Sequence, residues 1–110
     1  MNTSAGSEDV DGGGAEAGAR GEEKGGETEL EMLDRAQKAL SGRPGEALSI
    51  AEEHGRRFPK GGLAPEREVI AIQALAALGR REEARGRAER FRAAHPGSAY
   101  LRRIDVLLGK

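Results

Sequence analysis

The sequence lacks several features on which catalysis or membrane insertion commonly depends. Its 110 residues include no cysteine, which excludes disulfide bonds, a thiol nucleophile and any zinc site built on cysteine. No stretch approaches the roughly 20 consecutive apolar residues that cross a bilayer, and the N-terminus has no apolar run typical of a signal peptide. As the sequence stands, we expect a cytoplasmic protein. A fragment of a longer envelope protein would instead belong to the periplasm or cell envelope.

A paired histidine motif is also missing. The two histidines, His54 and His95, lie 41 positions apart, without the short spacing of a metal-ligand pair. His54 continues the inward-facing stripe of Ala47 and Ala51, and we interpret it as a packing residue. His95 precedes Pro96 at the end of a predicted helix, where a cation interacts favourably with the helix dipole. We interpret His95 as a capping residue.

Acidic pairs and glycine runs offer no catalytic site either. The adjacent carboxylates at 52–53 and 82–83 point in different directions on a helix, so neither pair makes a two-carboxylate site. The glycines at 12–14 lack the Lys-Ser/Thr that completes a phosphate-binding loop. We therefore predict that the protein is not an enzyme and that it uses no metal, cofactor or small-molecule substrate.

The first 28 residues differ in composition from the rest of the chain. They hold eight of the seventeen glycines and no aromatic residue, and seven acidic residues against two basic ones give them a net charge of −5. Such a stretch buries too little apolar surface to offset its ordering entropy. We predict a disordered, acidic, glycine-rich tail over residues 1–28 and a folded domain over residues 29–110. The acidic tail is interpreted as a solvated linker, with shielding of the basic remainder as the alternative.

Periodic apolar residues separated by glycine and proline predict an all-α fold. Apolar positions recur every three to four residues, as on one face of a helix, and Gly or Pro stands near the end of each such segment. The segments cover residues 29–40, 44–57, 65–78, 81–94 and 98–108. The third is the most apolar and should be the most buried, and Ser98 should be the N-cap of the last. No alternating run predicts a strand.

An internal repeat relates two halves of this helical region. When the chain is shifted by 37 residues it partly matches itself, and the matches fall at helix ends and helix contacts. The matching pairs are Gly42 and Gly79, Arg43 and Arg80, Glu46 and Glu83, Ala47 and Ala84, Ala51 and Ala88, and Pro59 and Pro96. Repeats of this length are typical of helical solenoids.

The second repeat unit resembles the tetratricopeptide repeat family. The residues 78–84 read Leu-Gly-Arg-Arg-Glu-Glu-Ala, and Pro96 follows Ala84 by twelve residues, as Pro59 follows Ala47. The ending at 91–98 is similar to a variant common in repeat domains of bacterial cell-envelope proteins, including outer-membrane assembly lipoproteins. The resemblance implies two antiparallel helical hairpins followed by a C-terminal capping helix.

The same resemblance implies a protein-interaction scaffold. Leading helices of such hairpins line a groove that binds a short peptide or a partner helix. The groove positions that the family pattern implies are Met32, Ala36, Glu66, Val69, Gln73 and Ala76. Because two units are few for a repeat domain, the module could also associate with itself.

An arginine-rich segment supports an alternative function. Residues 80–92 contain six arginines, and a small nucleic-acid-binding or regulatory protein would use them on one helix. The candidate anion-binding residues are Arg81, Arg85 and Arg92. Interleaved glutamates favour a solvated face with internal pairs such as Glu83–Arg87, four residues apart. We therefore do not expect nucleic acid as the partner.

Overall fold

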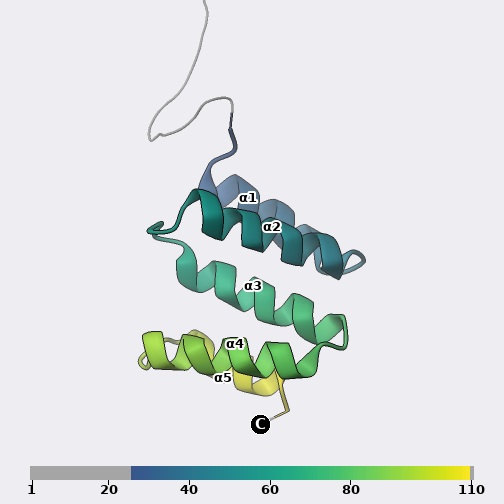
Figure 1. Ribbon diagram of the computed structural model, residues 1–110, viewed down its shortest axis with the longest axis vertical. Helices are drawn as coiled ribbons and strands as arrows, with labels where there is room; N and C mark the ends of the chain where they lie inside the picture. The colour runs from purple at the N-terminus through teal and green to yellow at the C-terminus, as the bar shows by residue number, and fades with distance from the viewer. Residues whose placement is uncertain (1–25, 110) are drawn as a thin grey trace, which may run out of the picture.

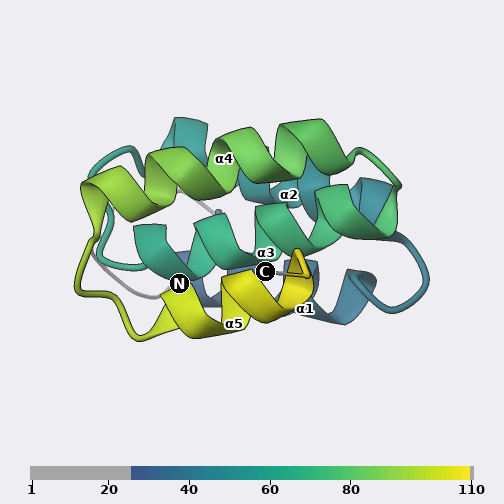
Figure 2. The same cartoon turned by 90° about the horizontal axis from the view of Figure 1, so that it is seen from below.

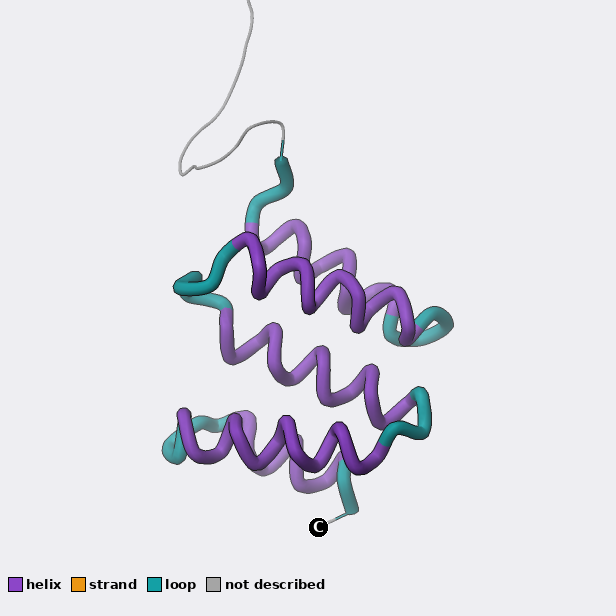
Figure 3. Tube along the Cα trace, in the orientation of Figure 1, coloured by secondary structure: helices purple, strands orange, loops and turns teal. Residues whose placement is uncertain are grey.

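Five α-helices and no strand make up the part of the chain that the computed structural model describes, residues 26–109 (Figures 1 and 3). This confirms the all-α prediction for these residues. The helices are α1 (Glu29–Ala39), α2 (Pro44–Arg57), α3 (Ala64–Ala77), α4 (Arg81–Ala94) and α5 (Tyr100–Leu107). Residues 1–25 of the predicted tail lie outside the described part of the chain.

Two residues that were predicted to belong to the tail, Glu27 and Thr28, form contacts with α1. Thr28 is the N-cap, and its side chain accepts a hydrogen bond from the backbone N–H of Glu31 at 3.1 Å while Glu31 accepts from the Thr28 N–H at 3.0 Å. This reciprocal capping box satisfies two backbone donors that a helix end otherwise leaves free. Glu27 accepts a hydrogen bond from Arg35 Nε at 2.7 Å. The folded part therefore begins slightly before residue 29.

Proline and glycine set the next helix boundaries as the sequence predicts. Pro44 occupies the first position of α2, where its missing N–H costs nothing. At the end of α3, Gly79 adopts φ of 79°, and the Arg80 N–H bonds back to the Leu75 carbonyl at 2.9 Å. A left-handed glycine at this place is the usual way to terminate a helix.

The start of α5 differs from the prediction. The helix begins at Tyr100 with Ala99 as N-cap, whereas Ser98 was expected to cap it. The Ser98 hydroxyl instead accepts a hydrogen bond from the Tyr100 N–H at 3.1 Å. A serine hydroxyl bonds as readily to the N–H two residues ahead in a local turn as it does at an N-cap, so the helix starts later.

Helix α3 is the centre of the molecule. It contacts α1, α2, α4 and α5, and α2 packs between α1 and α3. Figures 1 and 2 show α2 and α4 on one side of the molecule and α1 and α5 on the other. The buried residues of α3 are Val69, Ile70, Ala71, Ile72, Ala74 and Leu75, the largest buried set of any described helix. The prediction that the third segment is the most buried is confirmed.

Small residues allow the helices to approach one another. The repeated alanines of α2 and α4, which the sequence places four residues apart, are buried to 3% exposure or less. They are Ala47, Ala51, Ala84 and Ala88. Because an alanine side chain is small, a neighbouring helix can approach the backbone closely at these positions. Each repeat unit also ends with paired rings, His54 with Phe58 and Phe91 with His95. His95 takes the C-cap position of α4, so it lies at the helix end where it was expected.

Candidate interaction surfaces

Polar and small residues whose spacing places them on one side of a helix lie along α3, and the first of them, Glu66, contacts α5. Glu66, Gln73 and Ala76 are partly exposed there, as expected of groove residues. The Tyr100 hydroxyl of α5 donates a hydrogen bond to Glu66 Oε2 at 3.0 Å. The other carboxylate oxygen, Glu66 Oε1, and the amide oxygen Gln73 Oε1 are buried and have no hydrogen-bond partner among the described residues. We call the residues Glu66, Gln73, Ala76 and Ala77 the α3 stripe.

The remaining predicted groove residues are not exposed, so this part of the prediction is wrong. Met32 and Ala36 have 0% exposure and Val69 has 3%. Helix α1 packs against both α2 and α3, and this double contact covers the apolar positions that the repeat pattern places in the groove. These three side chains belong to the core and offer no surface to a partner.

The contact between Tyr100 and Glu66 connects α5 to α3. The hydrogen bond to Glu66, together with burial, raises the pKa of the Tyr100 phenol above its ordinary value. This shift favours the protonated phenol, which is the form that donates the hydrogen bond to Glu66. The two residues are 34 positions apart, and nothing in their local sequence indicates that they meet.

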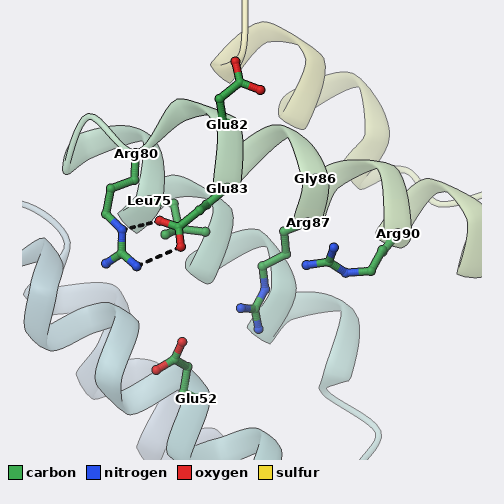
Figure 4. Close-up of a pocket in the computed structure, with 8 residues that line it drawn as sticks. All are labelled: Glu52, Leu75, Arg80, Glu82, Glu83, Gly86, Arg87 and Arg90. Atoms are coloured by element: carbon green, nitrogen blue, oxygen red, sulfur yellow. Dashed lines mark hydrogen bonds and ion pairs between the residues drawn. The ribbon is translucent and has the colours of Figure 1, made fainter.

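A hollow of about 340 Å³ lies on the opposite side of α3, between α2 and α4 (Figure 4). Its lining residues are Glu52, Leu75, Arg80, Glu82, Glu83, Gly86, Arg87 and Arg90. The lining includes three arginines and three glutamates, so their formal charges sum to zero. Arg80 is bonded to Glu83, and Arg87 to Glu68 at 2.7 Å. The hollow therefore lacks the uncompensated positive charge that would attract an anion.

The arginines of α4 do not gather into an anion site. Arg81 donates to the Leu108 carbonyl at 3.3 Å, and Arg92 pairs with Asp105 at 2.5 Å. Both contacts attach α4 to the C-terminal segment, whereas Arg85 is exposed. The prediction of an ion pair between Glu83 and Arg87 is wrong. Glu83 pairs with Arg80, and Arg87 pairs with Glu68 of α3. The candidate residues Arg81 and Arg92 thus have structural partners.

A chain of polar contacts crosses four helices through His54. This side chain has 0% exposure. Its Nε2 lies 3.0 Å from Glu29 Oε1 of α1, and its Nδ1 lies 3.5 Å from Arg67 Nη1 of α3. A carboxylate only accepts and a guanidinium only donates, so the neutral ring with its proton on Nε2 satisfies both neighbours. Burial lowers the pKa of His54 below its ordinary value, which favours this neutral form.

Arg67 extends the chain of contacts to α4. It bonds to Glu68 at 2.9 Å, and Glu68 accepts from Arg87 Nε at 2.7 Å. Burial alone would raise the pKa of Glu68, but its hydrogen bonds and charge interactions with Arg87 and Arg67 outweigh this and lower it. The sequence predicted that His54 is buried, which the structure confirms. It gave no sign of these partners, which lie on other helices.

Neither a membrane span nor a metal cluster is present in the described part of the chain. Within residues 26–109, no helix is long and apolar enough to cross a bilayer. Over the same range, no three His, Asp or Glu side chains are grouped so that they could hold a metal ion.

Comparisons of the chain with family models, with curated proteins and with solved structures found no match in any of the three. The resemblance to tetratricopeptide repeats therefore rests on the residue spacing within the sequence.

Proposed function

We propose that the protein is a non-catalytic interaction module of tetratricopeptide-like design, which binds a peptide or partner helix along the α3 stripe. Helices α1 and α5 flank α3 on the opposite side from α2 and α4 (Figures 1 and 2). The repeat pattern places the binding groove of such modules on their leading helices. Glu66, Gln73 and Ala76, which that pattern identifies, remain partly exposed in the structure.

The two unpaired acceptors of the stripe carry this proposal. A buried acceptor without a hydrogen bond costs about 1–3 kcal/mol, and folded proteins keep few of them. Glu66 Oε1 and Gln73 Oε1 are both of this kind and lie on one face of one helix. A partner that donates hydrogen bonds to them recovers this cost, which favours binding at the stripe over binding elsewhere.

Selection from a random peptide library displayed on phage tests the proposed function. The full chain is the bait, and bound peptides are measured again on Ala76→Trp, which fills the stripe, and on the control Glu82→Gln, which alters an exposed residue of α4. We expect peptides that bind the wild type and Glu82→Gln equally and lose affinity for Ala76→Trp by about tenfold or more. Recovery of no peptide, or of peptides that Ala76→Trp binds unchanged, contradicts the proposal.

A further inference from the structure

We propose that the partner of the α3 stripe is a cationic peptide segment in an extended conformation. Its lysine or arginine would bind Glu66, and a second hydrogen-bond donor three residues along the peptide would bind Gln73. This inference rests on the proposed function and specifies the chemistry of the same site.

The chemistry of the stripe selects donors. Both atoms that lack a partner are acceptors, and one belongs to a carboxylate. The second oxygen of Glu66, Oε2, already accepts a hydrogen bond from the Tyr100 hydroxyl. An apolar partner would leave both acceptors unpaired, and an acidic partner would in addition be repelled by the Glu66 carboxylate. A partner ammonium or guanidinium instead forms a charge-assisted hydrogen bond, which is among the stronger contacts available to a protein surface.

The spacing of the acceptors favours an extended partner. Glu66 and Gln73 are seven residues apart, which corresponds to about 10.5 Å along a helix. An extended chain in the polyproline II conformation has three residues per turn and rises about 3.1 Å per residue, so donors three residues apart lie on one face of the peptide and span about 9.3 Å. Ala76 and Ala77 continue the stripe beyond Gln73, and their small side chains leave room for a peptide backbone to lie close to α3.

The acceptors are within reach of a partner. Although the two oxygens are buried, the residues that carry them are partly exposed. A partner reaches these oxygens after a change of rotamer, which at Glu66 also moves Oε2 and exchanges its hydrogen bond from Tyr100 for the charge-assisted bond from the partner. Arg103 follows Tyr100 by three residues on α5 and so lies on the same side of that helix, where its positive charge acts against a cationic partner. Removal of that charge should strengthen binding.

Binding of a defined peptide to the full chain tests this inference. The probe is the acetylated, fluorescently labelled octapeptide Gly-Ser-Lys-Thr-Thr-Arg-Ser-Gly, with donors three residues apart, and its affinity is measured by fluorescence anisotropy. In the control peptide, Glu replaces both Lys and Arg. We expect Glu66→Gln and Gln73→Met each to weaken binding by about tenfold, Arg103→Gln to tighten it, and Glu82→Gln to leave it within about twofold. Circular dichroism verifies that each variant is folded.

The outcomes separate this inference from the proposed function. Equal affinity for the basic and acidic peptides, no binding of the basic peptide up to about 1 mM, or an equal effect of Glu66→Gln and Glu82→Gln overturns the inference. If a non-basic peptide from the library selection then shifts the amide resonances of Gln73 and Ala76, the proposed function stands and only the cationic partner is wrong. If bound peptides shift only resonances of α2 and α4, both proposals are wrong.

Discussion

At the scale of single residues, His54 shows how far sequence reasoning reaches. Its place on the apolar stripe of α2 predicts burial, and the structure confirms 0% exposure. The apolar pattern of α2 does not indicate that His54 contacts Glu29 and Arg67, which belong to other helices and are 25 and 13 residues away in the sequence. A periodic pattern reports which face of a helix is inside. It cannot report which side chain of another helix meets that face, because that depends on the crossing of the two helices.

The buried imidazole makes stability depend on pH. Since burial lowers the pKa of His54, the unfolded chain binds a proton between its ordinary pKa, about 6.5, and the lower folded value, whereas the folded chain does not. The free energy of unfolding therefore rises with pH across this interval, and the contribution of neutral His54 to it is lost progressively as the pH falls below about 7. Urea denaturation from pH 5 to 8 measures this slope. Titration of Glu68, whose pKa is lowered from 4.5, affects stability only at more acidic pH.

The variant His54→Gln isolates this effect. Glutamine can donate to Glu29 and accept from Arg67, as neutral histidine does, but it does not titrate. We expect it to flatten the slope between pH 7 and 5. A slope that persists unchanged in His54→Gln would show that other groups cause it.

At the scale of elements, helix boundaries are the part of the fold that local sequence predicts best. The predicted and observed ranges of α2 and α4 agree, because Pro44 and Gly79 impose their backbone preferences irrespective of the rest of the fold. The last helix is the exception. Its start depends on whether the Ser98 hydroxyl bonds two or three residues ahead, and the two choices differ little in energy.

Two glycine substitutions should change stability in opposite directions. Gly79 has φ of 79°, so Gly79→Ala forces a left-handed alanine and should lower the free energy of unfolding by about 1 kcal/mol. Gly86 lies inside α4, and a Cβ there would meet the Arg90 guanidinium at an ordinary 3.6 Å. Gly86→Ala should raise the free energy of unfolding by up to about 1 kcal/mol. Urea denaturation measures the free energy of unfolding of both variants. If the two substitutions change it in the same direction, the prediction is contradicted.

At the scale of the whole molecule, α5 is expected to unfold together with the rest of the described chain. It packs against α3, its Asp105 pairs with Arg92 of α4, and its Tyr100 donates a hydrogen bond to Glu66 of α3. Ile104 has 0% exposure and Val106 has 73%, so one helix offers both a core position and a surface position for comparison.

Alanine substitutions at these two positions test this cooperativity. Ile104→Ala should cost about 2–5 kcal/mol of global stability, whereas Val106→Ala should stay within about 0.5 kcal/mol. Thermal and urea denaturation followed by circular dichroism provide the measurement. If Ile104→Ala leaves the midpoint of the main unfolding transition unchanged, α5 unfolds independently of the other helices and the prediction is contradicted.

The sequence by itself determined the helical class, most helix boundaries, the central and most buried helix, and the alanine contacts. These follow from periodicity and from backbone preferences, which act over a few residues. Only the tertiary structure decided that Met32, Ala36 and Val69 are buried, that Arg81 and Arg92 attach α4 to the C-terminal segment, and that Glu66 and Gln73 carry unpaired acceptors. Each of these depends on how a helix lies against a second one far away in the chain, and the periodicity of a single helix contains no information on that geometry.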